Sequence, residues 1–447
     1  MPSLTPLYQA ALEYIQAGRA RLHMPGHKGS ADPSLFGGEL LPFDLTEADG
    51  LDSLYQSDGA IARTEEAYRR LYRTAASCIS AGGSTLGIQA MLALAVPPGG
   101  KVIMARNVHI AAVNTMALLD LTPVWLCPPL QRNCPHAAAV TPAQVEEALE
   151  RHPDADAVYV TSPDYYGQLC DVAAIGQICR ERDVPLLVDN AHGAHLRFLP
   201  QDLHPMTLGA SLCCDSLHKT LPVLTGGAML HVGDRRFAGR AKSRMSLFGS
   251  TSPSYLIMLS IDRCLDYLDR VEADLLRLLD RLEPLRALAA EQGYLPVSSS
   301  GQMDPARLTL SVWNSPLGRQ GFGDRLRGYG VEPEYLGPDY CVLLPSAFNP
   351  PSDFQRLEAF LRDTPARGDA LWQPVEWPLP PQVLSVREAT FSASELLPVE
   401  QCAGRIAAEA TILCPPGIPV VMPGEKIDSS LEKMIKNTGI QRLNVVK

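Results

Sequence analysis

The sequence predicts an α/β fold with a large domain built on a mainly parallel sheet, followed by a smaller α+β C-terminal domain. Between residues 77 and 232, short apolar segments alternate with helical segments. Such alternation is typical of a parallel sheet that is covered by helices on both faces. From residue 256 to residue 292, leucines recur at helical spacing, which predicts a long helical link between the two domains.

The elements of the large domain are expected in a regular order. A helix over 6–20 and loops over 21–60 come first, and Thr64-Glu65-Glu66 suits the N-terminus of a helix over 64–76. The expected strands cover 77–81, 101–105, 124–127, 157–161, 185–188, 211–214 and 228–232. The expected helices between them run up to residue 95 and over 109–119, 142–151 and 172–182.

The second half of the chain is less regular. Pro284 is expected to kink the long helical region and Gly293 to end it. Two strands are expected, near 308–312 and 341–344, and the Pro-rich residues 364–385 read as a connection. A final unit should contain a helix over 399–410 and end in a loosely held tail of about 20 residues. The expected divisions are 1–60, 61–275, 276–385 and 386–447.

The composition excludes several classes of protein. The chain has 447 residues, of which 46% are apolar and 20% charged, as in globular proteins. A net charge of −10 argues against nucleic-acid or anionic-membrane partners. We find no membrane-length apolar window and no signal peptide. Eleven scattered cysteines without a CxxC pair suit free thiols in a reducing cytoplasm, and no metal is expected because no Cys/His cluster has ligand spacing.

One motif points to a specific cofactor chemistry. Residues 215–220 (DSLHKT) place Lys219 beside His218 and two hydroxyls, one of them on Ser216, and an apolar strand runs into Asp189. Pyridoxal phosphate (PLP) needs a lysine for a Schiff base, an anion at its ring nitrogen and donors for its phosphate. Taken singly, Lys219 reads as a surface lysine and Asp189 as a strand-end cap or a metal ligand.

Other polar residues suit the same cofactor. Ser84 and Thr85 lie in GGSTLG (82–87) between a strand and a helix, where backbone N–H groups and the helix dipole favour phosphate. The turn lacks a P-loop lysine and is also compatible with an ordinary serine cap. His109 could stack on the ring or cap a helix. His192 could contact the ring or bond to backbone.

Further along the chain, Ser250 and Thr251 form a hydroxyl cluster before a helix. This cluster is compatible with phosphate binding or with helix capping.

Together these segments resemble the Orn/Lys/Arg decarboxylase family of fold-type-I PLP enzymes, over nearly the whole chain. The matching segments are LHMPGHKG (22–29), GGSTLG (82–87), ARNVH (105–109), TSPDYYG (161–167), LLVDNAHGAH (186–195), CDSLHKTLPVLTGG (214–227), STSPSY (250–255), VEPEY (331–335), GRIAAEA (404–410) and CPPGIPVVMPGEKI (414–427). The resemblance implies a PLP-dependent transferase-like large domain. It also implies a short form without an N-terminal response-regulator-like domain.

The resemblance also implies roles for residues. Lys219 would bind the cofactor covalently, Asp189 would face the ring nitrogen, and His109 would stack on the ring. Phosphate would be bound by Ser84, Thr85 and Ser216 and, from a neighbouring subunit of a homodimer or higher oligomer, by Ser250 and Thr251. His218 would assist proton transfer or position the carboxylate, and Glu425 would bind the distal cation of the substrate. The chain departs from the family at Asn190, where Glu is common, at Asp164, where Thr is frequent, and at Ile110-Ala111, where Lys-Ser is usual.

The expected function is PLP-dependent decarboxylation of arginine, lysine or ornithine to an amine and CO₂, in the polyamine metabolism of the cytoplasm. One alternative is transamination or elimination on the same fold, and another is a non-catalytic PLP-binding regulatory protein. The sequence does not choose among the three amino acids.

Overall fold

The computed structural model describes residues 5–17, 39–127, 139–294, 302–337, 339–366, 379–412, 419–437 and 439–447. The chain divides into two compact units, Met1–Ala95 with Pro185–Ala273, and Val96–Val184 with Asp274–Lys447. The boundaries expected at 60, 275 and 385 stay predictions. The segment 22–29 of the family resemblance lies outside the described residues.

The first unit contains four strands in the order β1 (Ala76–Ser80), β7 (Ala228–Val232), β6 (Leu212–Asp215) and β5 (Leu186–Asp189). Strands β5 and β6 are parallel, whereas β7 is antiparallel to both β6 and β1. Helix α3 (Gly83–Ala95) packs on β6 and β7. The other elements are η1 (Leu41–Phe43), η2 (Leu54–Gln56), η3 (Ala194–Phe198), α7 (Pro205–Leu208), α8 (Leu217–Thr220), α9 (Arg235–Ala238) and α10 (Ala241–Met245).

The second unit contains the parallel strands β4 (Ala157–Thr161), β2 (Lys101–Ala105) and β3 (Thr122–Leu126), in that order. Its helices α4 (Ile110–Leu119), α5 (Pro142–Arg151) and α6 (Val172–Glu181) follow the strands alternately. Strands β2 and β4 are short apolar segments with mostly buried side chains, as expected inside a parallel sheet, whereas β3 at the end of the order is only partly buried. The predicted α/β class with mainly parallel strands is therefore confirmed.

Helix α2 (Ala60–Tyr72) begins and ends earlier than predicted, and packs against α1 (Pro6–Gln16). The true N-terminal anchor is Asp52, whose carboxylate accepts hydrogen bonds from the backbone N–H groups of residues 53, 58, 59, 61 and 62. Thr64 lies inside the helix and donates to the Ala60 carbonyl oxygen and to the Asp262 carboxylate. The predicted start at Thr64 was wrong because a carboxylate in the preceding loop, eight residues before Ala60, caps the helix.

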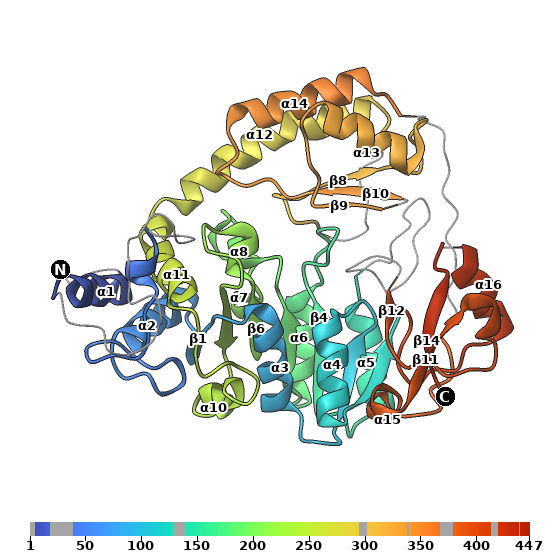
Figure 1. Ribbon diagram of the computed structural model, residues 1–447, viewed down its shortest axis with the longest axis horizontal. Helices are drawn as coiled ribbons and strands as arrows, with labels where there is room; N and C mark the ends of the chain where they lie inside the picture. Colours follow the sequence, from blue (N-terminus) through green and yellow to red (C-terminus); the bar gives the residue numbers. More distant parts are fainter. Residues whose placement is uncertain are drawn as a thin grey trace. The chain divides into compact units, whose positions relative to one another are not determined.

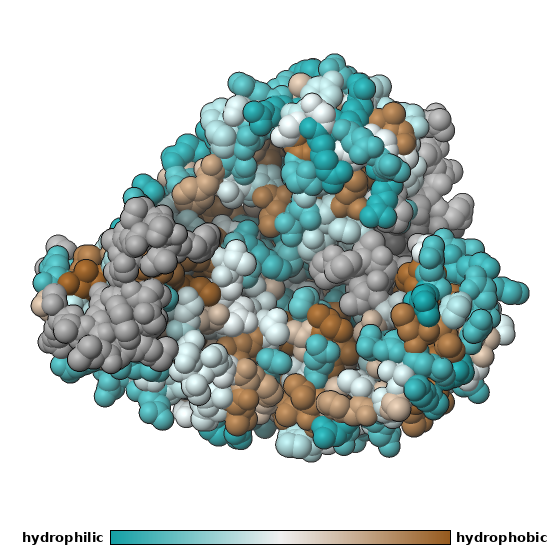
Figure 2. Space-filling model, viewed as in Figure 1, coloured by the Kyte–Doolittle hydropathy of each residue, from teal (hydrophilic) through white to brown (hydrophobic). Residues whose placement is uncertain are grey.

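The predicted long helical region consists of two helices, α11 (Tyr255–Leu268) and α12 (Val271–Glu291), and α12 continues through Pro284. The antiparallel strands β8 (Leu308–Ser311), β10 (Tyr340–Leu343) and β9 (Tyr335–Leu336) form a small sheet. Figure 1 shows helices α12, α13 (Gly318–Gly328) and α14 (Pro351–Asp363) on one face of this sheet. In Figure 2 the outward surface of these helices is mainly hydrophilic.

The last part of the chain is folded, and the prediction of a loosely held tail was wrong. Strand β14 (Arg442–Val446) pairs with β11 (Ser394–Pro398), and Leu443 and Val445 are buried in a common core. The helix predicted over 399–410 was also wrong, since only the 3₁₀ turn η4 (Val399–Gln401) forms and Gly404 has a φ of +84°. The remaining elements are α15 (Val386–Phe391), β12 (Thr411–Ile412), β13 (Pro419–Val421) and α16 (Ser429–Asn437).

Two observations bear on the expectations from composition. The cysteines within the described ranges are free thiols, and most of them are buried. Among the helices that the structure describes, none has the length and apolar character required to cross a bilayer.

Candidate active site

The ends of β5 and β6 bring the central predicted residues together. Asp189 is the last residue of β5, and Lys219 lies in α8, which begins two residues after β6. Because the two strands are parallel neighbours, their carboxyl ends lie at the same edge. The Nζ atom of Lys219 is 2.8 Å from Nε2 of His192, three residues beyond Asp189. The structure therefore brings His192 to Lys219, and the predicted contact of His192 with the cofactor ring stays a prediction.

The side chain of Asp189 points to the face of the strands that carries α3. It pairs in register with Cys214 of β6, so the two side chains share a face. The Sγ atom of Cys214 lies 3.5 Å from the Ser84 carbonyl oxygen of α3. Asp189 is 2% exposed, and its carboxylate accepts a hydrogen bond from the Ala191 N–H. A buried carboxylate fixed at a strand end can hold a proton on a facing ring nitrogen.

The residues predicted to bind phosphate lie at strand ends of the same unit. Ser216 is buried, and its Oγ has no hydrogen-bond partner among the described residues. Ser84 and Thr85 occupy the first turn of α3, where backbone N–H groups lack intrahelical acceptors. Gly83 opens this helix with a φ of +69°, a conformation that favours glycine. A buried orphan hydroxyl and a helix N-terminus are donors that suit a phosphate.

His218 is oriented by its own loop. Its Nδ1 lies 3.0 Å from the Gly227 carbonyl oxygen, so Nδ1 carries a proton and donates. The neighbouring Gly226 has a φ of +94°, and its carbonyl oxygen accepts a hydrogen bond from the Gly83 N–H. The glycines after the lysine therefore connect its loop to the start of α3.

His109, in the second unit, caps helix α4. Its Nδ1 accepts a hydrogen bond of 3.1 Å from the Ala111 N–H, which fixes the ring and leaves the proton of a neutral ring on Nε2. The capping role that we considered is confirmed, and stacking on the cofactor stays a prediction.

Ser250 and Thr251 are both exposed. The Ser250 Oγ accepts a hydrogen bond from the Ser252 N–H, which organises a local turn. Their predicted contact with a neighbouring subunit stays a prediction.

Glu425 forms a buried ion pair with Arg106, which follows strand β2. Two bonds of 2.7 Å join the guanidinium to both carboxylate oxygens, and Oε2 also accepts from the Met422 N–H. The exposed fractions of the two side chains are 6% and 1%, and the guanidinium lies 5.5 Å from the centre of the Trp125 ring. We did not single out Arg106 from the sequence, although it lies in the ARNVH segment. The substrate-binding role of Glu425 stays a prediction.

The departures from the family pattern have local explanations. The carboxylate of Asp164 accepts hydrogen bonds from the N–H groups of Tyr166 and Gln168 and so organises the turn after β4. Burial raises the pKa of Asp164 to about 6, although these bonds and Arg307 oppose the shift. Asn190 donates to Asp215, a residue whose role the sequence did not indicate. Ile110 is an exposed residue at the start of α4.

The residues present fit PLP. A lysine amine, a buried carboxylate, an orphan buried hydroxyl and a helix N-terminus come from one unit. They are the four kinds of group that the cofactor requires.

Comparisons with known proteins agree with this chemistry. The family model for the Orn/Lys/Arg decarboxylase major domain matches residues 5–286, and the model for its C-terminal domain matches residues 379–438. An arginine decarboxylase from Halalkalibacterium halodurans is 31% identical over 95% of this chain and 91% of its own length. One from Bacillus subtilis is 28% identical over 97% of this chain and 93% of its own.

Among solved structures, lysine decarboxylase A from Pseudomonas aeruginosa superimposes with a TM-score of 0.84 at 18% identity, covering 99% of this chain and 80% of its own. This likeness supports the fold. Together with the strand-end lysine and carboxylate, the family matches show that the chain belongs to the Orn/Lys/Arg decarboxylase family.

Proposed function

We propose that the protein is a PLP-dependent decarboxylase that converts arginine to agmatine and CO₂. The observation that carries the proposal is the placement of Lys219, 2.8 Å from His192, beside the buried carboxylate of Asp189 at neighbouring strand ends. Arginine is preferred because relatives named arginine decarboxylase align over more than nine-tenths of the chain. The constitutive lysine decarboxylase of Escherichia coli aligns over 59% of it.

Different residues of the first unit would hold different parts of the cofactor. When bound, PLP supplies the ring that accepts the electron pair left behind by CO₂. Lys219 would hold the cofactor covalently through its side-chain amine. Asp189 would keep a proton on the ring nitrogen, and Ser216 would donate a hydrogen bond to the phosphate. The N–H groups at the start of α3 would bind the same phosphate, with Ser84 and Thr85 contributing hydroxyls.

Proton transfer falls to the groups around Lys219. The Nζ···Nε2 contact gives the lysine amine a hydrogen-bond partner in His192. After decarboxylation the Cα carbon needs a proton, which Lys219 or His218 can supply as a general acid. His218 holds its Nδ1 proton on the Gly227 carbonyl oxygen, so its Nε2 is the nitrogen that gains and loses a proton.

The decisive experiment measures CO₂ release from arginine, lysine and ornithine by the wild type and Lys219→Ala. We expect turnover of arginine by the wild type, and loss of both turnover and the visible absorbance of the lysine-bound cofactor in the variant. Lys101→Ala, which removes a lysine that pairs with Asp154 outside the site, is the control. Formation of a keto acid would instead indicate transamination. A coloured protein without turnover would indicate a regulatory role.

The oligomeric state and cellular role follow from the same proposal. Ser250 and Thr251 are exposed in this single chain, as expected of residues that reach a neighbouring subunit's phosphate. A homodimer with shared sites predicts that inactive Lys219→Ala chains regain part of their activity when mixed with inactive Ser250→Ala/Thr251→Ala chains. Mixed dimers contain one intact site, and absence of recovery in verified mixed dimers would contradict sharing. The amine product places the enzyme in polyamine metabolism, which we propose to be cytoplasmic.

A further inference from the structure

A buried polar cluster lies behind the candidate site, on the opposite face of the same strands. Asp189 pairs in register with Cys214, so Cys213 and Asp215 point to the other face. His231 of β7 pairs with Cys213 and shares this second face. The cluster therefore contacts the two strands that carry the cofactor residues but lies away from α3.

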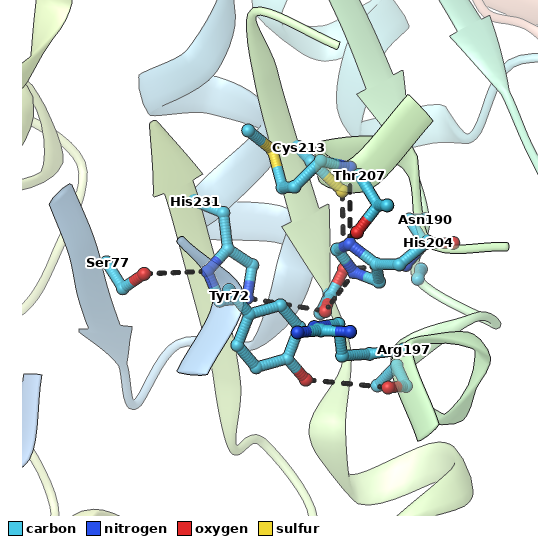
Figure 3. Close-up of polar contacts among 12 residues, drawn as sticks. Tyr72, Ser77, Asn190, Arg197, His204, Thr207, Cys213 and His231 are labelled. Carbon is cyan, nitrogen blue, oxygen red and sulfur yellow. Dashed lines mark hydrogen bonds and ion pairs between the residues drawn. The ribbon is translucent and has the colours of Figure 1, made fainter. Parts of the chain in front are cut away.

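Four donors converge on the carboxylate of Asp215, which has no exposed surface. Its Oδ2 lies 2.9 Å from His204 Nε2 and 3.3 Å from His231 Nε2. Its Oδ1 lies 2.7 Å from Asn190 Nδ2 and 3.3 Å from the Cys213 thiol. Figure 3 shows the rings of His204 and His231 coming from different parts of the chain, with the ring of Tyr72 against His231.

The hydrogen bond on the far side of the His204 ring fixes the tautomer of that ring when it is neutral. The Nδ1 of His204 accepts from the Met206 N–H at 3.2 Å, so a neutral ring carries its proton on Nε2. The Nδ1 of His231 lies 2.8 Å from Ser77 Oγ, and burial lowers the pKa of His231, which favours the neutral ring. Burial opposes ionisation of Asp215, but His204 and His231 outweigh it and hold its pKa well below the usual range. The cluster is a buried carboxylate that accepts hydrogen bonds from His204, Asn190 and Cys213.

The tautomer of His204 argues against a metal site, and burial argues against a catalytic triad. His204, Asp215 and His231 form the one group of metal-ligand type within the described ranges. A metal on His204 Nε2 would move the proton to Nδ1, where it would face the Met206 N–H. Ser77, His231 and Asp215 are arranged like a catalytic triad, but all three are buried, so the arrangement offers no route for a substrate.

We propose that Asp215 is a positioning residue for the cofactor, an inference that rests on the proposed function. Asn190 directly follows Asp189, and Ser216 directly follows Asp215. The 2.7 Å hydrogen bond between Asn190 and Asp215 therefore connects the backbone next to Asp189 with the backbone at the start of the segment that carries Ser216 and Lys219. Within this pair the acid is the last residue of β6, and the amide directly follows β5.

The test combines single substitutions with an exchange of the two side chains. The substitution Asp215→Asn replaces one carboxylate oxygen by an NH₂ group, which then faces the donors that converge on this position. In Asn190→Asp two carboxylates face each other. The double variant Asn190→Asp/Asp215→Asn again has one acid and one amide, with their positions exchanged. The amide oxygen at position 215 can then still accept a hydrogen bond from His204. A hydrogen bond to a charged group contributes enough to change an equilibrium by roughly ten- to hundredfold.

PLP affinity, measured by absorbance titration of the apoprotein, is the main readout, with apoprotein thermal unfolding alongside. We expect Asp215→Asn and Asn190→Asp each to bind PLP at least about tenfold more weakly than the wild type. The double variant should recover an affinity within about threefold of the wild type. Asp234→Asn, a helix cap elsewhere in the unit, is the control. If Asp215→Asn fails to fold, Asn190→Ala replaces it in the test, because this substitution removes only one hydrogen-bond donor. Asn190→Ala should weaken PLP binding several-fold.

The outcomes separate this inference from the proposed function. A wild type that binds no PLP defeats both. If the wild type binds PLP and decarboxylates arginine while folded Asp215→Asn or Asn190→Ala keeps the same affinity, Asp215 is merely structural. A folded double variant without recovered affinity also overturns the positioning role.

Discussion

The buried ion pair of Arg106 and Glu425 gives a sharp test of what Glu425 does. The substitution Glu425→Gln keeps the shape of the side chain but leaves the Arg106 guanidinium buried without its counter-charge. Both oxygens of Glu425 lie 2.7 Å from guanidinium nitrogens, and both side chains are nearly inaccessible to solvent. Removing one partner of such a pair costs about 3–5 kcal/mol in folding free energy.

The matched control is Glu395→Gln. Glu395 also pairs with an arginine, Arg405, at 2.7 Å, but the exposed fractions of that pair are 39% and 31%. Solvent screens such a pair, so its loss should cost about 0–1 kcal/mol. The difference of several kcal/mol between these two Glu→Gln substitutions follows from the burial of the first pair and from its two-fold contact with the guanidinium.

Urea unfolding followed by tryptophan fluorescence is the assay, because Trp125 lies beside the Arg106 guanidinium and reports on this region. We expect a clearly lower unfolding midpoint for Glu425→Gln than for Glu395→Gln. Equal midpoints for the two variants would refute the reasoning. If Glu425→Gln keeps wild-type stability but raises the KM for arginine, Glu425 binds substrate, as the resemblance implied.

Two further predictions concern the packing of the first unit. Burial raises the pKa of Asp262 to about 6, so the folded protein binds this proton more tightly than the unfolded chain. The stabilisation from this bound proton should be complete below about pH 4 and should disappear as the pH rises to about 6. The free energy of unfolding of the wild type, compared with that of Asp262→Asn, should therefore fall by roughly 3 kcal/mol between pH 4 and 7. A pH-independent difference in urea unfolding would contradict this. A Cβ on Gly87 would lie 2.1 Å from Cys214 Sγ, so Gly87→Ala should destabilise by about 1–3 kcal/mol. Cys214→Ala in the same chain should relieve part of this cost in thermal unfolding, and a purely additive double variant would show that the contact is not the cause.

The local elements that the sequence predicted well have local causes. Helix α5 has the predicted bounds because Thr141 and Gln144 form a complete capping box within four residues. Errors arose where the deciding group lies outside the element itself. Asp52 rather than Thr64 anchors α2, and the tail is ordered because β14 pairs with β11, more than forty residues earlier.

The same division holds for the site. The sequence by itself determined the α/β class and the family, and it singled out Lys219 and Asp189 as candidate cofactor residues, because period, motif and residue chemistry are properties of neighbouring positions. The tertiary structure alone decided that Glu425 pairs with Arg106 and that Asp215 gathers His204, His231 and Asn190. These partners are 11 to 319 positions apart. Only the folded sheet excludes water from them, and burial is what gives their charges and hydrogen bonds their strength.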